Sequence, residues 1–143
     1  MHKVLFVCHG NICRSPMAEF IMKDLVAKAG RSQEFEIASC AVSREEIGNP
    51  VYPPARRELS KHGISCAGKT ARQITQKDLS HYDHIYYMDA SNAHYLRRLF
   101  GDAASKCKSL LFRDVADPWY TGDFQQTWDD ILTGCTAILE ELK

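Results

Sequence analysis

The sequence predicts an α/β fold, a doubly wound four-stranded parallel sheet with helices on both faces. Four short apolar segments typical of buried strands alternate with segments of helical spacing. The chain also has no internal repeat and no low-complexity tract, either of which would favour another architecture. Strands and helices that alternate in this way form parallel sheets joined by right-handed crossovers.

The first half of the chain contains the first two predicted strands. Residues 4–7 form an apolar run that leads directly into a glycine-containing loop. Ser15 and the proline after it are typical of an N-cap and first turn, and Gly30 ends the helix. A second β-prone segment, residues 35–39, precedes a turn-rich region and a helix that ends near Gly63.

The second half repeats the alternation. Strands are predicted at residues 83–88 and 109–112, and a helix at residues 91–100 lies between them. Asp123 is a candidate N-cap for a long final helix. The apolar stripe of that helix consists of Phe124, Trp128, Ile131, Cys135, Ile138 and Leu142.

Length and composition indicate a single domain, residues 1–143. Lys and Arg number 18 and balance 18 Asp and Glu, so no net charge attracts nucleic acid or an anionic membrane. No secretory signal and no run of about 20 apolar residues is present. We therefore expect a cytoplasmic protein that binds neither partner, in which the six cysteines are thiols.

The loop after the first strand has the composition of an oxyanion site. Ligands of such sheets bind at the carboxyl ends of the strands, and five residues separate Cys8 from Arg14 there. Gly10 and Asn11 tolerate a left-handed backbone, which lets the loop turn successive N–H groups inward. The following helix adds its positive N-terminal dipole, and Arg14 suits bidentate binding of a phosphate.

Cys8 is the candidate nucleophile of this loop. A helix N-terminus and a nearby cation favour the thiolate form near neutral pH, and the Ser15 hydroxyl is in reach to stabilise it. Two other interpretations exist. Cys8 is a small buried hydrophobe in the first, and in the second Cys8, His9 and Cys13 bind zinc, although no further ligand pair has suitable spacing.

A second predicted catalytic group is Asp117. An ester oxygen that leaves phosphorus needs a proton, and the loop itself contains no acid. Asp117 follows the last strand, and the proline after it favours an extended backbone that directs the carboxyl into the crevice. Trp119 and Tyr120 would form a wall for a planar aromatic substrate. The alternative is an Asp-Pro turn with ordinary aromatic packing.

With these segments the chain resembles the low-molecular-weight protein tyrosine phosphatases. The resemblance covers nearly the whole length and includes residues 7–19, Ser39, residues 48–50, the Met88-Asp89 and Ser91-Asn92 pairs, and Asp117 with the proline after it. It implies hydrolysis of phosphotyrosine in proteins and of small aryl phosphates, with inorganic phosphate or other oxyanions as product or inhibitor. No cofactor and no metal is implied, and the expected state is a monomer or weak homodimer.

The resemblance also implies a role for each site residue. Cys8 forms a phosphocysteine, Arg14 binds phosphate and stabilises the transition state, and Asp117 is acid and base. The residues that bind phosphate or support the loop are His9, Gly10, Asn11, Ile12, Cys13, Ser15, Ser39 and Asp89, of which Asp89 orients Arg14. Cys13 matches a family cysteine that can form a disulfide with the nucleophile.

Two residues depart from the family pattern and bear on substrate choice. The position after the nucleophile is His9, and Glu45 stands at the rim where a bulky residue is common. Together with Ile12, Trp119 and Tyr120, Glu45 is expected to line the substrate pocket. An acidic rim would repel acidic phosphopeptides or attract basic ones, and a solvated loop charge is the plain alternative.

Three other functions are compatible with the loop. Arsenate reductases resemble this fold but need further cysteines on a mobile segment, and none lies between Cys66 and Cys107. Arginine phosphatases also resemble it but favour threonine where this chain has Ile12, whose bulk suits a flat ring. A phosphate-binding module without turnover would be expected to lack Cys8 or Asp117.

Overall fold

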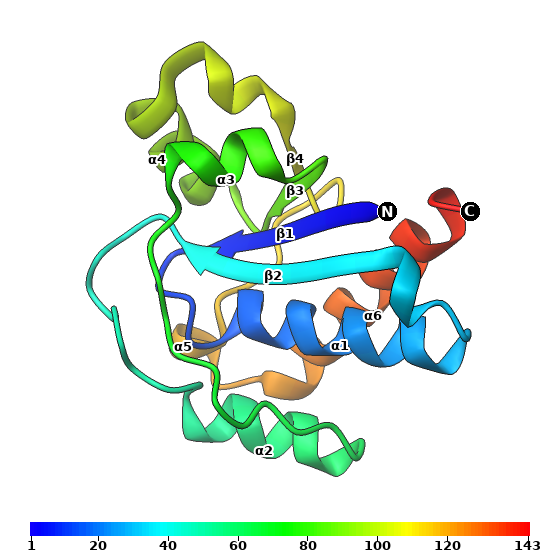
Figure 1. The fold of residues 1–143 in the computed structure, drawn as a ribbon. Coiled ribbons are helices and arrows are strands. Elements are labelled where there is room, and N and C mark those ends of the chain that lie inside the picture. Colours follow the sequence, from blue (N-terminus) through cyan, green and yellow to red (C-terminus); the bar gives the residue numbers. More distant parts are fainter.

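The computed structural model describes residues 1–143 and contains the predicted four-stranded parallel sheet (Figure 1). The strands are β1 (His2–Cys8), β2 (Phe35–Ala41), β3 (His84–Tyr87) and β4 (Cys107–Ser109), in the spatial order β2-β1-β3-β4. After β1 the chain forms β2 on one side of it, and later forms β3 and β4 on the other side. The topological switch point therefore lies at the carboxyl end of β1, where open α/β sheets bind their ligands.

Helices cover both faces of the sheet (Figure 1). Helices α1 (Arg14–Lys28) and α6 (Phe124–Glu141) lie on one face, and α2 (Pro53–Lys61) packs against both. The short helix α3 (Gln76–His81) and helix α4 (Ala90–Phe100) lie on the other face. The remaining elements are α5 (Pro118–Thr121) and the 3-10 helices η1 (Ser32–Glu34) and η2 (Gly101–Lys106).

Strand β1 is buried on both faces, as its continuous apolar run predicts. Val4 and Phe6 belong to the core that α1 and α6 cover, whereas Leu5 and Val7 belong to the core under α3 and α4. All four side chains are fully buried. Burial of such side chains contributes about 1.5–3 kcal/mol each, so the strand that carries the site loop is firmly fixed.

The start of α1 and the position of β4 differ from the prediction. Ser15 is not the N-cap, because α1 begins at Arg14 after Cys13 and the Ser15 hydroxyl turns to other partners. The last strand spans Cys107–Ser109 rather than residues 109–112. The Leu110 N–H still donates to the Tyr87 carbonyl of β3, but Phe112, at the end of the predicted run, is fully exposed.

The last helix agrees with its sequence pattern. The Asp123 carboxylate accepts a hydrogen bond of 3.0 Å from the Gln126 N–H and caps α6. Of the predicted stripe, Trp128, Ile131, Cys135 and Ile138 are buried, and Phe124 and Leu142 are partly buried. None of the helices combines the length and the apolar character needed to cross a bilayer.

Candidate active site

Hydrogen bonds to its carbonyl groups hold the loop after β1 in place, whereas several of its N–H groups have no partner in the protein. The carbonyls of Cys8, His9 and Ile12 accept backbone hydrogen bonds of 2.9–3.1 Å from residues of the segment 42–52. The N–H groups of Gly10, Ile12 and Cys13 donate no hydrogen bond to the protein, and these residues line a pocket of about 240 Å³. Available amides in a turning loop are the donors that bind an oxyanion.

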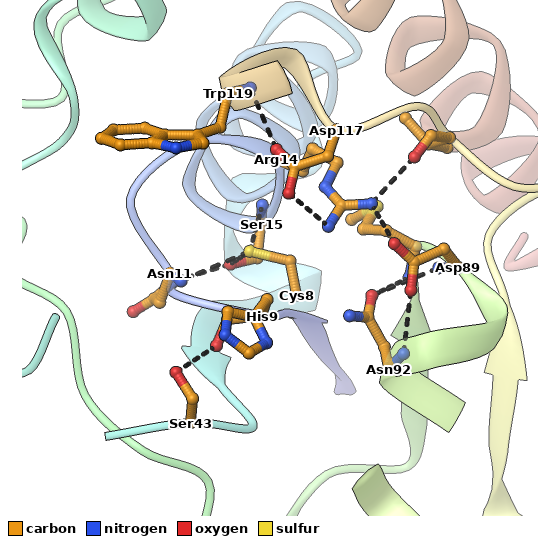
Figure 2. Close-up of polar contacts among 12 residues, drawn as sticks. Cys8, His9, Asn11, Arg14, Ser15, Ser43, Asp89, Asn92, Asp117 and Trp119 are labelled. Carbon is orange, nitrogen blue, oxygen red and sulfur yellow. Dashed lines mark hydrogen bonds and ion pairs between the residues drawn. The ribbon is translucent and has the colours of Figure 1, made fainter. Parts of the chain in front are cut away.

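Two backbone donors and a hydroxyl group surround the Cys8 sulfur at the floor of this pocket (Figure 2). The N–H groups of Asn11 and Ser15 lie 3.3 and 3.4 Å from Sγ, and the Ser15 hydroxyl oxygen lies 3.0 Å from it. The sequence context predicts Ser15 as a helix cap, but its hydroxyl instead contacts the Cys8 sulfur.

Asn11 fixes the shape of the loop. It has the left-handed φ of 60°, the only positive value at a non-glycine residue. Its amide group donates to Ser15 at 2.8 Å and to Ser39 at 3.0 Å, and its carbonyl accepts from the backbone N–H of Arg72. Gly10 also tolerates this conformation but does not adopt it; a Cβ there would lie 3.3 Å from the Glu46 side chain.

A buried carboxylate supports Ser39 from below. The Ser39 hydroxyl donates to Glu19 at 2.6 Å, and Lys23 and Lys69 lie 2.6 and 3.3 Å from the two oxygens of that carboxylate. Glu19 is 5% exposed, so its charge needs these cations. A continuous chain of hydrogen bonds thus runs from Glu19 through Ser39, Asn11 and Ser15 to the sulfur.

The Arg14 guanidinium lies between two carboxylates (Figure 2). Nη1 donates to Asp89 at 2.6 Å and to the Val115 carbonyl at 2.8 Å, and Nη2 lies 3.4 Å from Asp117. Burial opposes the charge, but Cys8, Asp89 and Asp117 outweigh it and raise the pKa of Arg14 above its usual value. Arg14 therefore stays cationic and fixed in orientation at 2% exposure.

Asp89 is itself oriented by the start of α4. One carboxylate oxygen accepts from the Asn92 N–H at 2.8 Å, while the Asn92 side chain accepts from the N–H groups of Met88 and Asp89. This capping box leaves the other oxygen of Asp89 for Arg14. The Asp89 carboxylate thus caps α4 and holds Arg14 at the same time.

Asp117 reaches the pocket from the loop between β4 and α5. Its φ of −77° and ψ of 112° are extended, as the following proline predicts, and one carboxylate oxygen accepts from the Trp119 N–H at 3.0 Å. The loop is anchored by a bond from the Val115 N–H to the Met88 carbonyl and by two hydrogen bonds from the Arg113 guanidinium to Asp130 on α6. The carboxylate thus faces Arg14 on a supported loop.

The walls of the pocket combine aromatic and acidic groups. The residues that line it are Cys8, His9, Gly10, Ile12, Cys13, Arg14, Glu45, Glu46, Asp117, Trp119 and Tyr120. The Trp119 ring packs against Tyr52 with 4.8 Å between centroids, although Trp119 itself is half exposed. At the rim, His9 Nε2 lies 2.9 Å from a Glu45 oxygen.

All predicted pocket residues therefore come together. Burial, with the neighbouring Cys8 and Asp117, raises the pKa of the Cys13 thiol. The zinc interpretation of Cys8, His9 and Cys13 lacks a suitable ligand set. No three His, Cys, Asp or Glu side chains are placed to hold a metal ion.

Comparison with known proteins identifies the family. The family model of the low molecular weight phosphotyrosine protein phosphatases matches residues 3–143. The chain belongs to this family. A relative from Bacillus subtilis, the low molecular weight protein-tyrosine-phosphatase YfkJ, is 42% identical over all of this chain and 97% of its own length.

Solved structures of the phosphatase family agree with the fold. The crystal structure of YfkJ superimposes with a TM-score of 0.95 over 99% of this chain and 94% of that one. The low molecular weight protein tyrosine phosphatase of Streptococcus pyogenes gives 0.93 at 39% identity, covering 100% and 94% of the two chains. A Drosophila arginine phosphatase gives 0.86 at 31% identity, covering 99% and 98%.

Several residues of the phosphatase site are not evident from sequence reasoning. Glu46 lines the pocket beside Glu45, and Tyr52 supports Trp119. Glu19 and Lys69 act behind Ser39, and the Val115 carbonyl helps hold Arg14. The only sequence signal for Glu46 is its position next to a predicted rim residue. The others depend on contacts between distant segments.

Proposed function

We propose that this chain hydrolyses phosphotyrosine in proteins through a phosphocysteine on Cys8. One observation carries the proposal: Cys8, Arg14 and Asp117 line the same pocket, and Arg14 and Asp117 lie 3.4 Å apart. The pocket thus holds a thiol, a fixed cation and a carboxyl group side by side. These are the three groups that transfer of a phosphoryl group to sulfur requires.

In the first step the Cys8 thiolate attacks phosphorus and a sulfur–phosphorus bond forms. The bond from phosphorus to the tyrosine oxygen breaks, and that oxygen takes the proton of the Asp117 carboxyl group. In the second step Asp117 removes a proton from water, and the water oxygen bonds to phosphorus. The sulfur–phosphorus bond breaks, inorganic phosphate leaves, and both the thiolate and the protonated Asp117 return.

The surrounding groups stabilise charge at each stage. Arg14 and the available amides of the loop bind the phosphoryl oxygens, whose charge is spread in the transition state. The Ser15 hydroxyl, 3.0 Å from the sulfur, stabilises the thiolate both as it attacks and as it leaves. Asp89 acts as a positioning residue through its 2.6 Å bond to Arg14.

The walls support phosphotyrosine rather than phosphoarginine as substrate. The arginine phosphatase of Drosophila shares the fold and 31% of the sequence, so overall similarity does not separate the two activities. The pocket here offers the branched Ile12 side chain on one side and Trp119, backed by Tyr52, on another. Apolar and aromatic walls suit a flat ring.

A thiol relay of the arsenate reductase type has little support. Such a relay needs additional cysteines that reach the nucleophile in turn. Besides Cys8, only Cys13 lines the pocket, whereas Cys40, Cys66 and Cys135 are buried elsewhere. The structure offers no sequence of exposed thiols leading away from the loop.

The proposal extends to the state of the protein. We infer a single phosphatase domain over residues 1–143, a monomer or weak homodimer in the cytoplasm, inhibited by phosphate and other oxyanions. All six cysteines are free thiols, which fits a reducing compartment. The available loop amides support the binding of phosphate as product.

A panel of substrates tests the proposed function. Purified protein is given a phosphotyrosine peptide, the matching phosphoserine and phosphoarginine peptides, and arsenate with a thiol reductant. We expect release of phosphate from phosphotyrosine with the highest kcat/KM and none from the Cys8→Ser variant. Cys107→Ser, a substitution on β4 outside the pocket, is the matched control and should remain active. Preference for phosphoarginine or arsenate would refute the assignment.

A further inference from the structure

A groove next to the catalytic pocket is not used by the chemistry described above. The loop after β2 and helix α4 form it, and we call it the arginine groove; the residues used below are Arg44, Glu45, Gln73, Tyr95, Arg98 and Leu99. Glu45 lines both the groove and the catalytic pocket. A substrate peptide that leaves the catalytic pocket across Glu45 therefore enters the arginine groove directly.

The groove presents two cations without partners. Arg44 and Arg98 are exposed, and neither forms an ion pair or a side-chain hydrogen bond within the protein. The Arg98 guanidinium carbon lies 5.8 Å from the centroid of the Tyr95 ring, which supports the side chain from one side. Guanidinium groups presented in this way bind carboxylates, often through two hydrogen bonds.

The acidic group at the boundary is already engaged. The Glu45 carboxylate receives His9 Nε2 at 2.9 Å, and the His9 ring in turn packs edge-on against Tyr95 with centroids 5.5 Å apart. The sequence alone points to Glu45 as the charge that acts at the rim. In the structure one oxygen of that carboxylate contacts His9 while the Glu45 side chain stays 69% exposed, and the groove beyond it adds the two cations Arg44 and Arg98.

We propose that the arginine groove binds an acidic side chain of the phosphoprotein, within a few residues of the phosphotyrosine. An extended chain advances about 3.3 Å per residue, so a flanking Asp or Glu reaches a groove that shares a wall with the pocket. Leu99, 45% exposed, adds an apolar contact for the peptide. The inference rests on the proposed phosphotyrosine activity and specifies the substrate class.

Paired peptides test the groove. Two phosphotyrosine peptides differ only in flanking Glu and Asp residues, which the second peptide replaces by Gln and Asn. For the wild type we expect kcat/KM to be about three- to tenfold higher for the acidic peptide, because exposed ion pairs give modest gains. The preference should fall as salt is added. Equal kcat/KM for the two peptides would overturn the proposal.

Variants locate the preference in the groove. In Arg44→Gln/Arg98→Gln the ratio of the two kcat/KM values should fall to about one, and Arg44→Glu/Arg98→Glu should favour a peptide with flanking lysines. Arg97→Gln is the matched control, because Arg97 precedes Arg98 on α4 but lines a different pocket. It should keep the wild-type ratio, and a preference that survives in Arg44→Gln/Arg98→Gln would place recognition elsewhere.

Failure of the groove and failure of the proposed function give different results. Each protein is also assayed with p-nitrophenyl phosphate, which has no flanking residues and reports on the catalytic pocket. Hydrolysis of both phosphotyrosine peptides at equal kcat/KM refutes the groove alone. Hydrolysis of p-nitrophenyl phosphate with neither peptide accepted refutes phosphotyrosine proteins as substrates, and the groove proposal with them.

Discussion

At the residue scale, the side chains proposed to act in catalysis are held in place by hydrogen bonds from supporting residues. The Cys8 sulfur accepts from the N–H groups of Asn11 and Ser15 and lies 3.0 Å from the Ser15 hydroxyl, which in turn accepts from the Asn11 amide. Arg14 is held by Asp89 and the Val115 carbonyl. Preorganised dipoles of this kind stabilise a charged transition state without reorganisation during the reaction.

The acid role of Asp117 is tested by substrates with different leaving groups. In Asp117→Asn we expect kcat/KM for a phosphotyrosine peptide to fall about 100- to 10,000-fold, because kcat/KM reports the first step, in which the basic tyrosine oxygen needs a proton. The fall for p-nitrophenyl phosphate should be smaller, since its leaving group is weakly basic. Steady-state kinetics on both substrates measures the difference.

The control for this prediction is Asp114→Asn in the same loop. Asp114 accepts a hydrogen bond from the Ala90 N–H and does not line the pocket, and the asparagine carbonyl can keep that bond. Its kinetics should stay near those of the wild type. Equal losses on both substrates in Asp117→Asn would indicate that the carboxyl group supports the structure without donating the proton.

At the element scale, the loop that carries Asp117 is anchored on α6. The Arg113 guanidinium donates to both Asp130 oxygens at 2.8 and 3.2 Å, and Gln126 adds a third hydrogen bond. The Asp130 side chain is 6% exposed, whereas Arg113 is largely open to solvent. The hydrogen bond from Arg113 outweighs burial and lowers the pKa of Asp130 below its ordinary 3.8.

This anchor predicts a pH-dependent contribution to stability. A carboxyl group with a lowered folded pKa stabilises the protein above its unfolded pKa, and the effect is lost as the pH falls through the folded pKa. Asp130→Asn should therefore unfold at lower urea concentration than the wild type at neutral pH. The gap should close below pH 3.8, as the wild-type carboxyl group takes up its proton.

The matched control is the adjacent Asp129→Asn. Asp129 is exposed; its carboxylate accepts from Gln125, its backbone carbonyl accepts from Thr133, and it has no cation partner. Its urea midpoint should stay close to that of the wild type at neutral pH. A gap for Asp130→Asn that is the same at neutral and acidic pH would show that the carboxylate charge contributes nothing.

At the scale of the whole molecule, the sheet order explains why distant residues meet. Strand β1 is central, so the loop that begins at Cys8 lies beside the segments that follow β2, β3 and β4. Ser39 lies near the end of β2, Asp89 follows β3, and Asp117 follows β4 along the chain. The parallel arrangement brings the carboxyl ends of the strands to one edge of the sheet (Figure 1).

Much of this architecture could be predicted because the signals are local. The buried runs of β1 and β2, the proline after Asp117 and the Asp123 cap each act within a few residues. The sequence pattern places the last strand at residues 109–112, whereas β4 spans Cys107–Ser109 and Phe112 is exposed. A three-residue strand has too few side chains to show a period.

The rest of the site depends on contacts that no local pattern contains. The role of Glu19 appears only when α1 lies beside β2 and meets Ser39 and Lys69. Likewise, Ser15 has the sequence context of a helix cap, and only the return of the chain to the sulfur reveals its other partner. The contacts of these residues are therefore set by packing between segments that are distant in the sequence.

Trapping the intermediate tests the central claim most directly. Asp117→Asn is mixed with p-nitrophenyl phosphate, quenched rapidly in denaturant and digested for peptide mass spectrometry. Without its base the variant should break down the intermediate slowly, so one phosphoryl group is expected on the peptide that contains Cys8, and the double variant with Cys8→Ser should carry none. The account is contradicted if Asp117→Asn releases phosphate at its steady-state rate without an adduct on Cys8. An adduct on another residue would contradict it as well.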